Sequence, residues 1–325
     1  MESKRIKRIG VLTSGGDSPG MNAAIRAIAR TASANSIACL GIRRGYNGLI
    51  NEDVIELDAR RVDGIITHGG TMLYTARCEE FKTREGIVKA VHTCSYLGID
   101  SLIAIGGDGT FRGAKDLSEN GIRIIGIPGT IDNDISSTEY TIGFDTACTT
   151  ALDAVDKLRD TMQSHERCSV VEVMGRHAGH LALYVGIASG ATAVLTPESP
   201  VDFEEDIFEK IRTGRIRGRN HHIIIVAEGF GNAQEVADRI HEETGIETRV
   251  TILGHVQRGG SPTVRDRVAA TLMGSYAVDI LMEGKQNRIV CMQNGKICDM
   301  DIIEALNMSK PLDPNMLKVQ KIVSI

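Results

Sequence analysis

The alternation of short apolar runs with longer helix-like segments is the feature that most constrains the fold of this chain. Runs rich in β-branched residues predict strands, and several of the intervening segments have helical periodicity. The predicted strands cover residues 6–12, 37–42, 64–67, 101–105, 123–127, 169–173, 193–195, 222–227 and 248–253. Because these runs are continuously apolar, they are typical of parallel strands buried on both faces.

The helical segments complete this pattern. The clearest apolar stripes lie in 146–163 and 263–284. Strands that alternate with helices predict right-handed βαβ units and a parallel sheet, in which ligands bind beyond the carboxyl ends of the strands. A length of 325 residues suggests about two domains. A loop dense in turn residues precedes the first of the two helices and indicates a boundary near 140–146.

Several classes of protein are disfavoured. No apolar run approaches the ~18 residues of a membrane span, and the apolar part of the N-terminal stretch is too short for a signal peptide. Seven cysteines without a CxxC pair argue against a disulfide framework or a structural zinc site, and they fit a reducing cytoplasm. A net charge of −5 with six Phe, six Tyr and no Trp argues against nucleic-acid binding.

The loop after the first predicted strand, 13–25, is rich in glycine. Gly15 and Gly16 leave backbone N–H groups accessible, and Ser18 and Pro19 then open a helix whose N-terminus favours phosphate. A strand–turn–helix corner with an Asp cap is the alternative for this loop alone. The chain has neither GxxxxGK[ST] nor GxGxxG, since GFGNAQ at 229–234 lacks the third glycine. P-loop NTPases and Rossmann dehydrogenases are therefore disfavoured.

A second glycine-rich loop, IGGDGTFRGA at 105–114, surrounds one carboxylate. Gly106, Gly107 and Gly109 flank Asp108 at the carboxyl end of a predicted strand. A single carboxylate beside a backbone anion site suits Mg²⁺ carried in by a nucleotide. A type I′ hairpin turn at Asp108–Gly109 is the alternative, although a helix-like segment rather than a strand follows.

The third loop, PGTIDND at 128–134, carries two carboxylates. Asp132 and Asp134 would point the same way if the segment were extended. In a phosphate site one carboxylate can lie near the metal and the other near a hydroxyl that must lose its proton. Alone, the string could be an Asx-rich turn, but as the third Gly/Asp loop after a strand it is predicted to be functional.

Arginines beside glycines are the candidate cations. Arg77, Arg176 and Arg258 follow predicted strands and could neutralise phosphoryl oxygens, whereas a single arginine is more often a solvated surface charge. His221 and His222 open a strand and are expected to be edge residues. The basic segment 212–222 predicts either a solvated loop or a separate anion site for a phosphorylated effector.

Taken together, these loops resemble the bacterial ATP-dependent 6-phosphofructokinases. TSGGDSPGMNAAIR, GGTMLYTAR, IGGDGT, PGTIDNDI, VVEVMGR, AEG and LGHVQRGGSP occur in that family's order and spacing, from about residue 6 to 310. GGDGT alone is shared with NAD kinases and lipid kinases. The resemblance implies two similar three-layer α/β/α domains with mainly parallel sheets and an active site in the cleft between them. Residues 1–143 plus 257–307 would bind ATP, and 144–256 plus 308–325 would bind fructose 6-phosphate.

The implied reaction is phosphorylation of fructose 6-phosphate at its C1 hydroxyl in glycolysis, with Mg²⁺ and ATP as donor. The matching catalytic residues are Asp132 as general base, Gly16, Arg77, Thr130, Asp134 and Arg176. The matching ATP-binding residues are Gly16, Tyr46, Arg77, Cys78, Gly107, Asp108, Gly109 and Thr110, with Asp108 on the metal. The matching sugar-phosphate-binding residues are Thr130, Asp132, Arg167, Met174, Gly175, Arg176, Glu228, Arg249, His255 and Arg258.

The resemblance also implies a quaternary state and a donor. Arg167 and Arg249 match arginines that this family donates across a subunit interface, so the expectation is a cytoplasmic homotetramer whose monomer is inactive, with no nucleic-acid or membrane partner. Pyrophosphate-dependent relatives carry Asp at the position of Gly109 and Lys at that of Gly129. The glycines therefore favour ATP.

The effector site departs from the family pattern. The matching phosphate-binding positions are Arg26, Arg30, Arg159, Arg217, Arg219 and His221. However, Thr192 and Ala59 stand where the best-known members have Glu and Arg, which removes a carboxylate and a cation. Activation by ADP or inhibition by phosphoenolpyruvate is therefore expected to be weak, altered or absent.

Three rival functions stay open. A relative of the NAD or lipid kinases would share GGDGT but is not expected to carry both PGTIDND and MGR. A non-catalytic nucleotide-sensing subunit would be expected to lack Asp132 or Asp108, and both are present. A pyrophosphate-dependent kinase is the third, and turnover with ATP against pyrophosphate distinguishes it.

Overall fold

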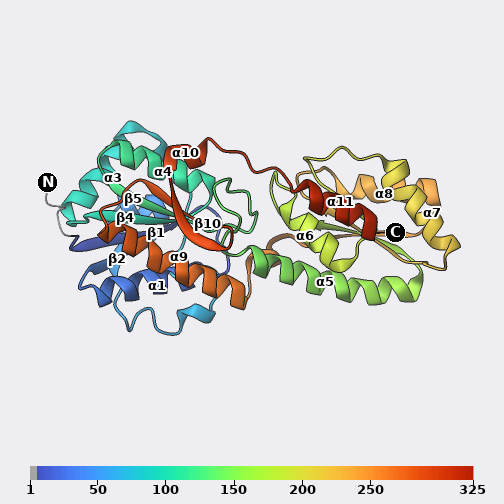
Figure 1. Cartoon of the computed structure of the whole chain (residues 1–325), viewed down its shortest axis with the longest axis horizontal. Coiled ribbons are helices and arrows are strands. Elements are labelled where there is room, and N and C mark those ends of the chain that lie inside the picture. The colour runs from blue at the N-terminus through green and yellow to red at the C-terminus, as the bar shows by residue number, and fades with distance from the viewer. Residues whose placement is uncertain (1–5, 325) are drawn as a thin grey trace. The chain divides into compact units, whose positions relative to one another are not determined.

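The computed structural model describes residues 6–324, which fall into two compact units coloured by residue number in Figure 1. The first unit comprises the described residues up to Thr130, together with Ile135–Asp145 and Arg258–Lys310. The second comprises Ile131–Asp134, Thr146–Gln257 and the described residues from Pro311. Both units are α/β, as expected from the alternating pattern.

The first unit is built on a seven-stranded, mainly parallel sheet. The strand order is β11 (Lys296–Asp301), β10 (Arg288–Gln293), β5 (Arg123–Pro128), β4 (Ser101–Gly106), β1 (Arg8–Ser14), β2 (Ala38–Ile42) and β3 (Val54–Glu56). The two edge strands, β11 and β3, run antiparallel to their neighbours. The inner strands are buried on both faces, which explains why their sequences are apolar without alternation.

Helices cover both faces of this sheet and make three layers (Figure 1). On one face, Val11 and Ile103 pack with α1 (Met21–Ala34) and α9 (Val264–Met282). On the other, Leu12 and Leu102 pack with α2 (Gly45–Ile50), α3 (Arg84–Tyr96), α4 (Asp108–Glu119) and α10 (Ile302–Leu306). Successive strand residues thus alternate between two cores.

The second unit contains a four-stranded parallel sheet. Its order is β7 (Ala193–Leu195), β8 (His222–Ala227), β6 (Cys168–Val173) and β9 (Thr248–Ile252). Its helices are α6 (His180–Ser189), α7 (Glu209–Ile216), α8 (Ala233–Thr244), α11 (Pro314–Val323) and the part of α5 (Phe144–His165) from Thr146 onward. A π-helical turn, η3 (Glu204–Phe208), precedes α7 and packs with α8 over a core that includes Val170 and Ile224.

Several local predictions were wrong. The predicted strand 64–67 is a 3₁₀ turn (Ile65–Thr67). Gly64 has φ +73°, and the segment pairs with no strand among residues 6–324, while Ile65 and Ile66 pack against the first core. β3, β10 and β11 were missed. The turn between β10 and β11 is Asn294–Gly295, both with positive φ, so the sequence did contain a hairpin signal.

At two strand ends the structure decides between interpretations. The alternative of a hairpin turn at Asp108–Gly109 is excluded, since the two residues begin α4 and the helix-like segment after them is a helix. His222 is not an edge residue, because β8 lies between β7 and β6 and the side chain is fully buried. No helix within residues 6–324 is both long and apolar enough to cross a membrane.

Candidate active site

Three Gly/Asp loops leave the sheet of the first unit side by side. In the strand register, Ser14 at the end of β1 pairs with Gly106 at the end of β4, and Gly106 pairs with Pro128 at the end of β5. Loops 15–20, 107–110 and 129–134 therefore start from one edge, at the carboxyl ends where α/β sheets bind ligands.

The first loop is held in place by a neighbouring segment that carries Arg77. Gly15 has φ +86°, and its carbonyl accepts a hydrogen bond from Thr75 Oγ1 at 2.7 Å. Thr13 Oγ1 donates to the carbonyl of Tyr74 at 3.0 Å. Arg77 itself is exposed, whereas Cys78 is half-buried against the core. The loop and an accessible guanidinium thus share one side of the sheet edge.

The second loop forms the N-terminus of α4. Gly107 precedes the helix in an extended conformation, and Thr110 Oγ1 donates to the carbonyl of Ser14 at 3.0 Å. A Cβ on Gly106 would lie 2.4 Å from that same carbonyl oxygen, so the close approach of the two loops requires glycine there. A Cβ on Gly109 would meet no atom within 4 Å. The open helix N-terminus is suited to phosphate oxygens.

Tyr46 packs against the N-terminal part of α4 and does not line open space. Its side chain is buried and stacks on Phe81 with ring centroids 4.1 Å apart. Its hydroxyl donates to the carbonyl of Thr110 at 2.6 Å, and burial raises the pKa of the phenol above its ordinary value. A direct contact between Tyr46 and a nucleotide would need this packing to open.

Asp108 is the accessible carboxylate of the site. Its side chain is 48% exposed and forms an i,i+4 ion pair with Arg112, with Nε 2.8 Å from Oδ2. Among residues 6–324, no group of three or more His, Cys, Asp or Glu side chains converges to hold a metal ion. An ion here would rest on one carboxylate and on ligand oxygens, a donor set that suits Mg²⁺.

The third loop turns sharply instead of running extended. Gly129 N donates to the carbonyl of Gly106 at 3.0 Å, and Thr141 Oγ1 donates to the carbonyl of Thr130 at 2.7 Å. Asn133 has φ +51°, so the extended geometry that would align Asp132 with Asp134 is absent. Asp132 is buried and Asp134 half-buried.

A buried carboxylate that the sequence analysis missed holds the far end of this loop. Asp266 on α9 accepts hydrogen bonds from Tyr140 Oη at 2.5 Å and from Gly143 N at 2.7 Å. The burial of Tyr140, followed by the negative charge of Asp266, raises the pKa of the Tyr140 phenol. An aspartate in the first turn of a predicted helix gives no sequence signal of this role, because N-terminal aspartates usually face solvent.

Arg258 lies against the first loop. Its Nη1 donates to the carbonyl of Asp17 at 3.1 Å, and a Cβ on Gly16 would lie 2.5 Å from the same nitrogen. A side chain at Gly16 would displace the guanidinium end of Arg258. Gly16 and Arg258 were expected to bind different ligands, whereas the structure brings the two residues together.

In the second unit, the loops after β6 and β8 are folded onto each other. Arg176 N donates to Glu228 Oε1 at 2.5 Å, and Gly175 and Arg176 both have positive φ. A Cβ on Gly229 would lie 2.3 Å from the carbonyl of Arg176. Burial, followed by the charge of Glu228, raises the pKa of Glu172. The MGR and AEG motifs thus form one compact surface.

Gln257 completes this surface and was also missed. Its Oε1 accepts from Met174 N at 3.2 Å, and its Nε2 donates to the carbonyl of Gly254 at 3.0 Å. Its side chain is fully buried, whereas neighbouring His255 is exposed. The sequence feature that could have indicated Gln257 is its position inside the LGHVQRGGSP motif.

Arg167 and Arg249 are not brought to these residues within one chain. Arg167 directly precedes β6, and Arg249 is the second residue of β9, so both lie at the amino end of the sheet. Both form ion pairs with Glu247: Arg167 Nε lies 2.8 Å from Oε2, and Arg249 Nη2 lies 2.5 Å from Oε1. The hydrogen bonds and charges of these arginines lower the pKa of Glu247. The length of β6 separates them from Met174 by roughly 20 Å.

Part of the effector set gathers in the second unit. The Arg159 guanidinium donates to the carbonyl of Ser189, and Arg219 Nη2 donates to that of Gly190 at 3.4 Å. Burial, then Arg219 and Arg159, lower the pKa of His221. Arg217 is exposed.

The remaining effector positions are arranged differently. Arg26 and Arg30 lie on α1 in the first unit, where Arg30 pairs with Asp63 at 3.1 Å, and exposed Ala59 belongs to the same unit. Thr192 is buried, with Oγ1 3.3 Å from Nδ1 of His222. Its side chain is therefore directed at a core histidine.

Comparison with known proteins gives one consistent result. A family model described as phosphofructokinase matches residues 8–281. Curated proteins named ATP-dependent 6-phosphofructokinase from Bacillus velezensis and Bacillus subtilis are each 54% identical over 320 residues, covering 98% of this chain and 100% of the relative. A solved phosphofructokinase structure from Saccharomyces cerevisiae has a TM-score of 0.88 at 36% identity, covering 98% of this chain and 48% of that one.

Proposed function

The chain belongs to the phosphofructokinase family, and from this membership we propose that it transfers the γ-phosphoryl group of ATP to the C1 hydroxyl of fructose 6-phosphate. The product is fructose 1,6-bisphosphate, formed in glycolysis. The observation that carries the proposal is the register Ser14–Gly106–Pro128, which aligns three phosphate-type loops at one sheet edge. Full-length relatives named for the same activity support it.

The first unit is proposed to bind ATP. Phosphate oxygens would lie against Gly16, the N-terminus of α4 at Gly107, Gly109 and Thr110, and the exposed Arg77. Cys78 and Tyr46 lie behind these groups. Asp108 is accessible enough to hold Mg²⁺, which when bound neutralises charge on the phosphate oxygens.

Asp132 is proposed as the base that accepts the proton of the C1 hydroxyl. A buried carboxylate fixed in a tight turn loses little freedom when substrate binds, and Thr130 and Asp134 flank it. Phosphoryl transfer passes through a loose transition state, so charge neutralisation and positioning do most of the work. Arg77 and Arg176 would neutralise the transferring group.

The sugar phosphate is proposed to bind the second unit. Met174, Gly175, Arg176, Glu228 and His255 would meet the sugar, and Arg258 would approach from the LGHVQRGGSP loop. Arg167 and Arg249 would serve the 6-phosphate of an adjacent subunit, which explains why they lie at the opposite end of β6 in their own chain. The active form is then a homotetramer, and its place is the cytoplasm.

Regulation is proposed to depart from the ADP and phosphoenolpyruvate pattern. Arg159 and Arg219 keep a pair of cations beside His221, but Thr192 is buried against His222 and brings no carboxylate. An effector bound through Mg²⁺ therefore loses a ligand. The test is whether either compound shifts saturation by fructose 6-phosphate.

The test of the function is a coupled assay of fructose 1,6-bisphosphate formation with ATP and, in parallel, with pyrophosphate. ATP should support turnover and pyrophosphate should not. Asp132→Asn should lower kcat by about 10²–10⁴-fold, with fructose 6-phosphate binding retained. Unchanged turnover in this variant would refute the assignment of the base, and absence of product with ATP would refute the function.

A further inference from the structure

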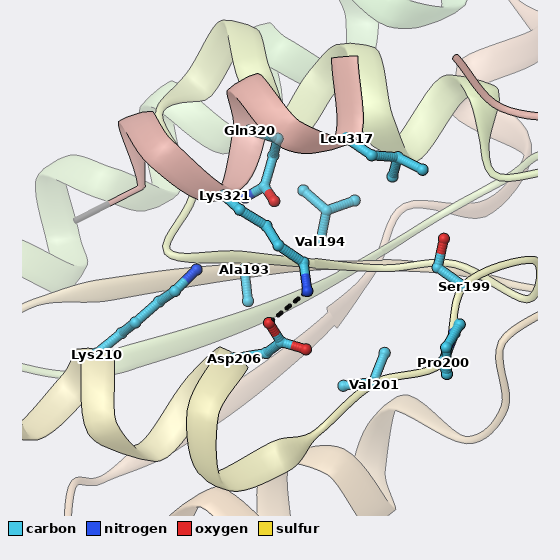
Figure 2. A pocket seen from close by; sticks show the side chains of 10 residues that line it. All are labelled: Ala193, Val194, Ser199, Pro200, Val201, Asp206, Lys210, Leu317, Gln320 and Lys321. Atoms are coloured by element: carbon cyan, nitrogen blue, oxygen red, sulfur yellow. Dashed lines mark hydrogen bonds and ion pairs between the residues drawn. The ribbon is translucent and has the colours of Figure 1, made fainter. Parts of the chain in front are cut away.

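A cavity of about 230 Å³ lies in the second unit under the C-terminal helix. Figure 2 shows its walls: Leu317, Gln320 and Lys321 come from α11, Ala193 and Val194 from β7, and Asp206 and Lys210 from η3 and α7. Ser199, Pro200 and Val201 close the remaining side. All of these residues belong to one unit.

The charges of the ionisable side chains that line the cavity do not sum to zero. Lys321 Nζ lies 2.8 Å from Asp206 Oδ1, so this lysine is neutralised by an ion pair (Figure 2). Asp206 Oδ2 also accepts from Asp202 N at 3.1 Å, which ties the carboxylate to the start of η3. Lys210 has no such partner: among residues 6–324, no side-chain carboxylate lies within ion-pair distance of its ammonium.

Lys210 is therefore a partly desolvated surplus cation. Its Nζ donates to Ser324 Oγ at 2.7 Å and more weakly to the carbonyl of Thr192 at 3.4 Å. Burial lowers the pKa of the ammonium; Asp206 opposes this change and Lys321 adds to it. A bound anion would relieve the cost of burying this charge.

A second, independent group also lacks a partner. Gln320 is only 5% exposed, and its Nε2 has no hydrogen-bond partner among residues 6–324. The side chain descends from α11 toward the sheet, beside Lys321 (Figure 2). A buried amide donor without a partner is destabilising, so this position is suited to a ligand acceptor oxygen.

We propose that the cavity under α11 binds a small organic carboxylate with a short aliphatic body. Its carboxylate would accept from Lys210 and Gln320, and its chain would lie against Val194, Val201 and Leu317. One surplus cation matches a monoanion better than a phosphate dianion, and the apolar walls match a hydrocarbon chain. The volume lies below the ~300–1,000 Å³ of drug-sized ligand sites, so the body is short.

The proposal is tested with butyrate as probe on the full chain, by ligand-observed NMR titration at neutral pH. Inorganic phosphate supplies charge without the aliphatic body, and n-butanol supplies the body without charge. Lys210→Met removes the surplus cation, and Leu317→Phe narrows the cavity while keeping its charges. Lys318→Met is the matched control, because Lys318 lies on the exposed side of α11.

The expected result is millimolar binding of butyrate to the unchanged chain and to Lys318→Met. Binding should be at least about tenfold weaker in both Lys210→Met and Leu317→Phe, since each removes part of the recognition. Circular dichroism confirms that each variant is folded. Equal affinity in all variants, phosphate or butanol binding as tightly as butyrate, or no binding at tens of millimolar would each overturn the proposal.

Discussion

At the scale of single residues, the local chemistry depends on where glycines leave the backbone accessible and on which side chains are buried. Gly106 is glycine because the carbonyl of Ser14 occupies the space of a side chain, whereas Gly109 faces open space at a helix N-terminus. A packing role therefore explains Gly106, and the open space at Gly109 is compatible with the phosphate contact proposed for it. Tyr46 shows the opposite case, a residue expected near nucleotide that is buried under α4.

Gly109→Asp should fold normally and use ATP poorly. Open space accommodates the side chain, but its charge would repel phosphate by about 1–4 kcal/mol at ~4 Å, which lowers kcat/KM for ATP by about 5- to 1,000-fold. Gly109→Ala adds bulk without charge and should retain most of the activity. Equal losses in the two variants, measured by initial rates, would show that bulk rather than charge matters.

His222 should make the second unit sensitive to acid. Burial, then the charges of Arg219, His221 and Arg215, lower its pKa from 6.5 to about 4. Because the folded-state pKa lies below the unfolded one, the neutral ring stabilises the fold fully above about pH 6.5, and this stability is lost as the pH falls toward 4. The loss amounts to about 3 kcal/mol.

Urea unfolding followed by circular dichroism at pH 7 and pH 4 measures this effect. His222→Gln should lose less stability between the two pH values than the unchanged chain does. His165→Gln, at an exposed position on α5, serves as the control and should behave like the unchanged chain. Parallel pH profiles for all three proteins would contradict the role of His222.

At the scale of elements, helices and strands hold the loops from outside the site. α9 fixes the end of the 129–143 loop through Asp266, and Tyr46 on α2 fixes the start of α4. In the second unit, buried Gln257 joins the LGHVQRGGSP loop to the backbone after β6. These supporting groups are distant in sequence from the segments that they hold, so short sequence motifs do not reveal their role.

Asp266→Ala should destabilise the first unit and reduce turnover. The change leaves Tyr140 Oη and Gly143 N without their acceptor, at about 1–3 kcal/mol for each buried donor. Tyr140→Phe removes only one partner and should cost about 1 kcal/mol. Unfolding curves measure both effects. A positioning role further requires that kcat fall by a larger factor than KM rises in Asp266→Ala. It also requires that Asp266→Glu restore part of the lost kcat.

At the scale of the whole molecule, one chain does not assemble all the predicted substrate contacts. Arg167 and Arg249 lie at the amino end of the second sheet, whereas the MGR and AEG loops follow the carboxyl ends. Two ends of one strand cannot serve one small ligand, so the arginines are available to another subunit. This arrangement makes oligomerisation part of the proposed activity.

Mixed oligomers should recover activity from two inactive parents. Asp132→Asn lacks the base and Arg249→Ala lacks the donated cation, so an interface that joins the two can contain one intact site. Refolding the variants together should yield clear activity, whereas each alone stays near background. If Arg249 acted within its own chain, no mixed site would be complete and the mixture would remain inactive.

The sequence by itself determined the layered α/β class, most strand positions, the three Gly/Asp loops and the family, because these depend on local apolar pattern and contiguous motifs. The edge strands β3 and β11 escaped because their half-polar sequences lack the continuous apolar run of buried strands. The inner strand β10 was missed because its apolar run, Ile289–Met292, is only four residues long. The hairpin signal between β10 and β11 at Asn294–Gly295 was too short to define the two strands alone.

Only the tertiary structure decided which distant groups meet. Strand register aligned Ser14, Gly106 and Pro128, and it placed Arg167 and Arg249 at the opposite end from Met174. Packing between loops brought Arg258 onto Gly16. The cavity under α11 likewise joins residues from 193 to 321. The physical reason is that register and packing are set by contacts between segments far apart in the chain, which no local pattern of residues encodes.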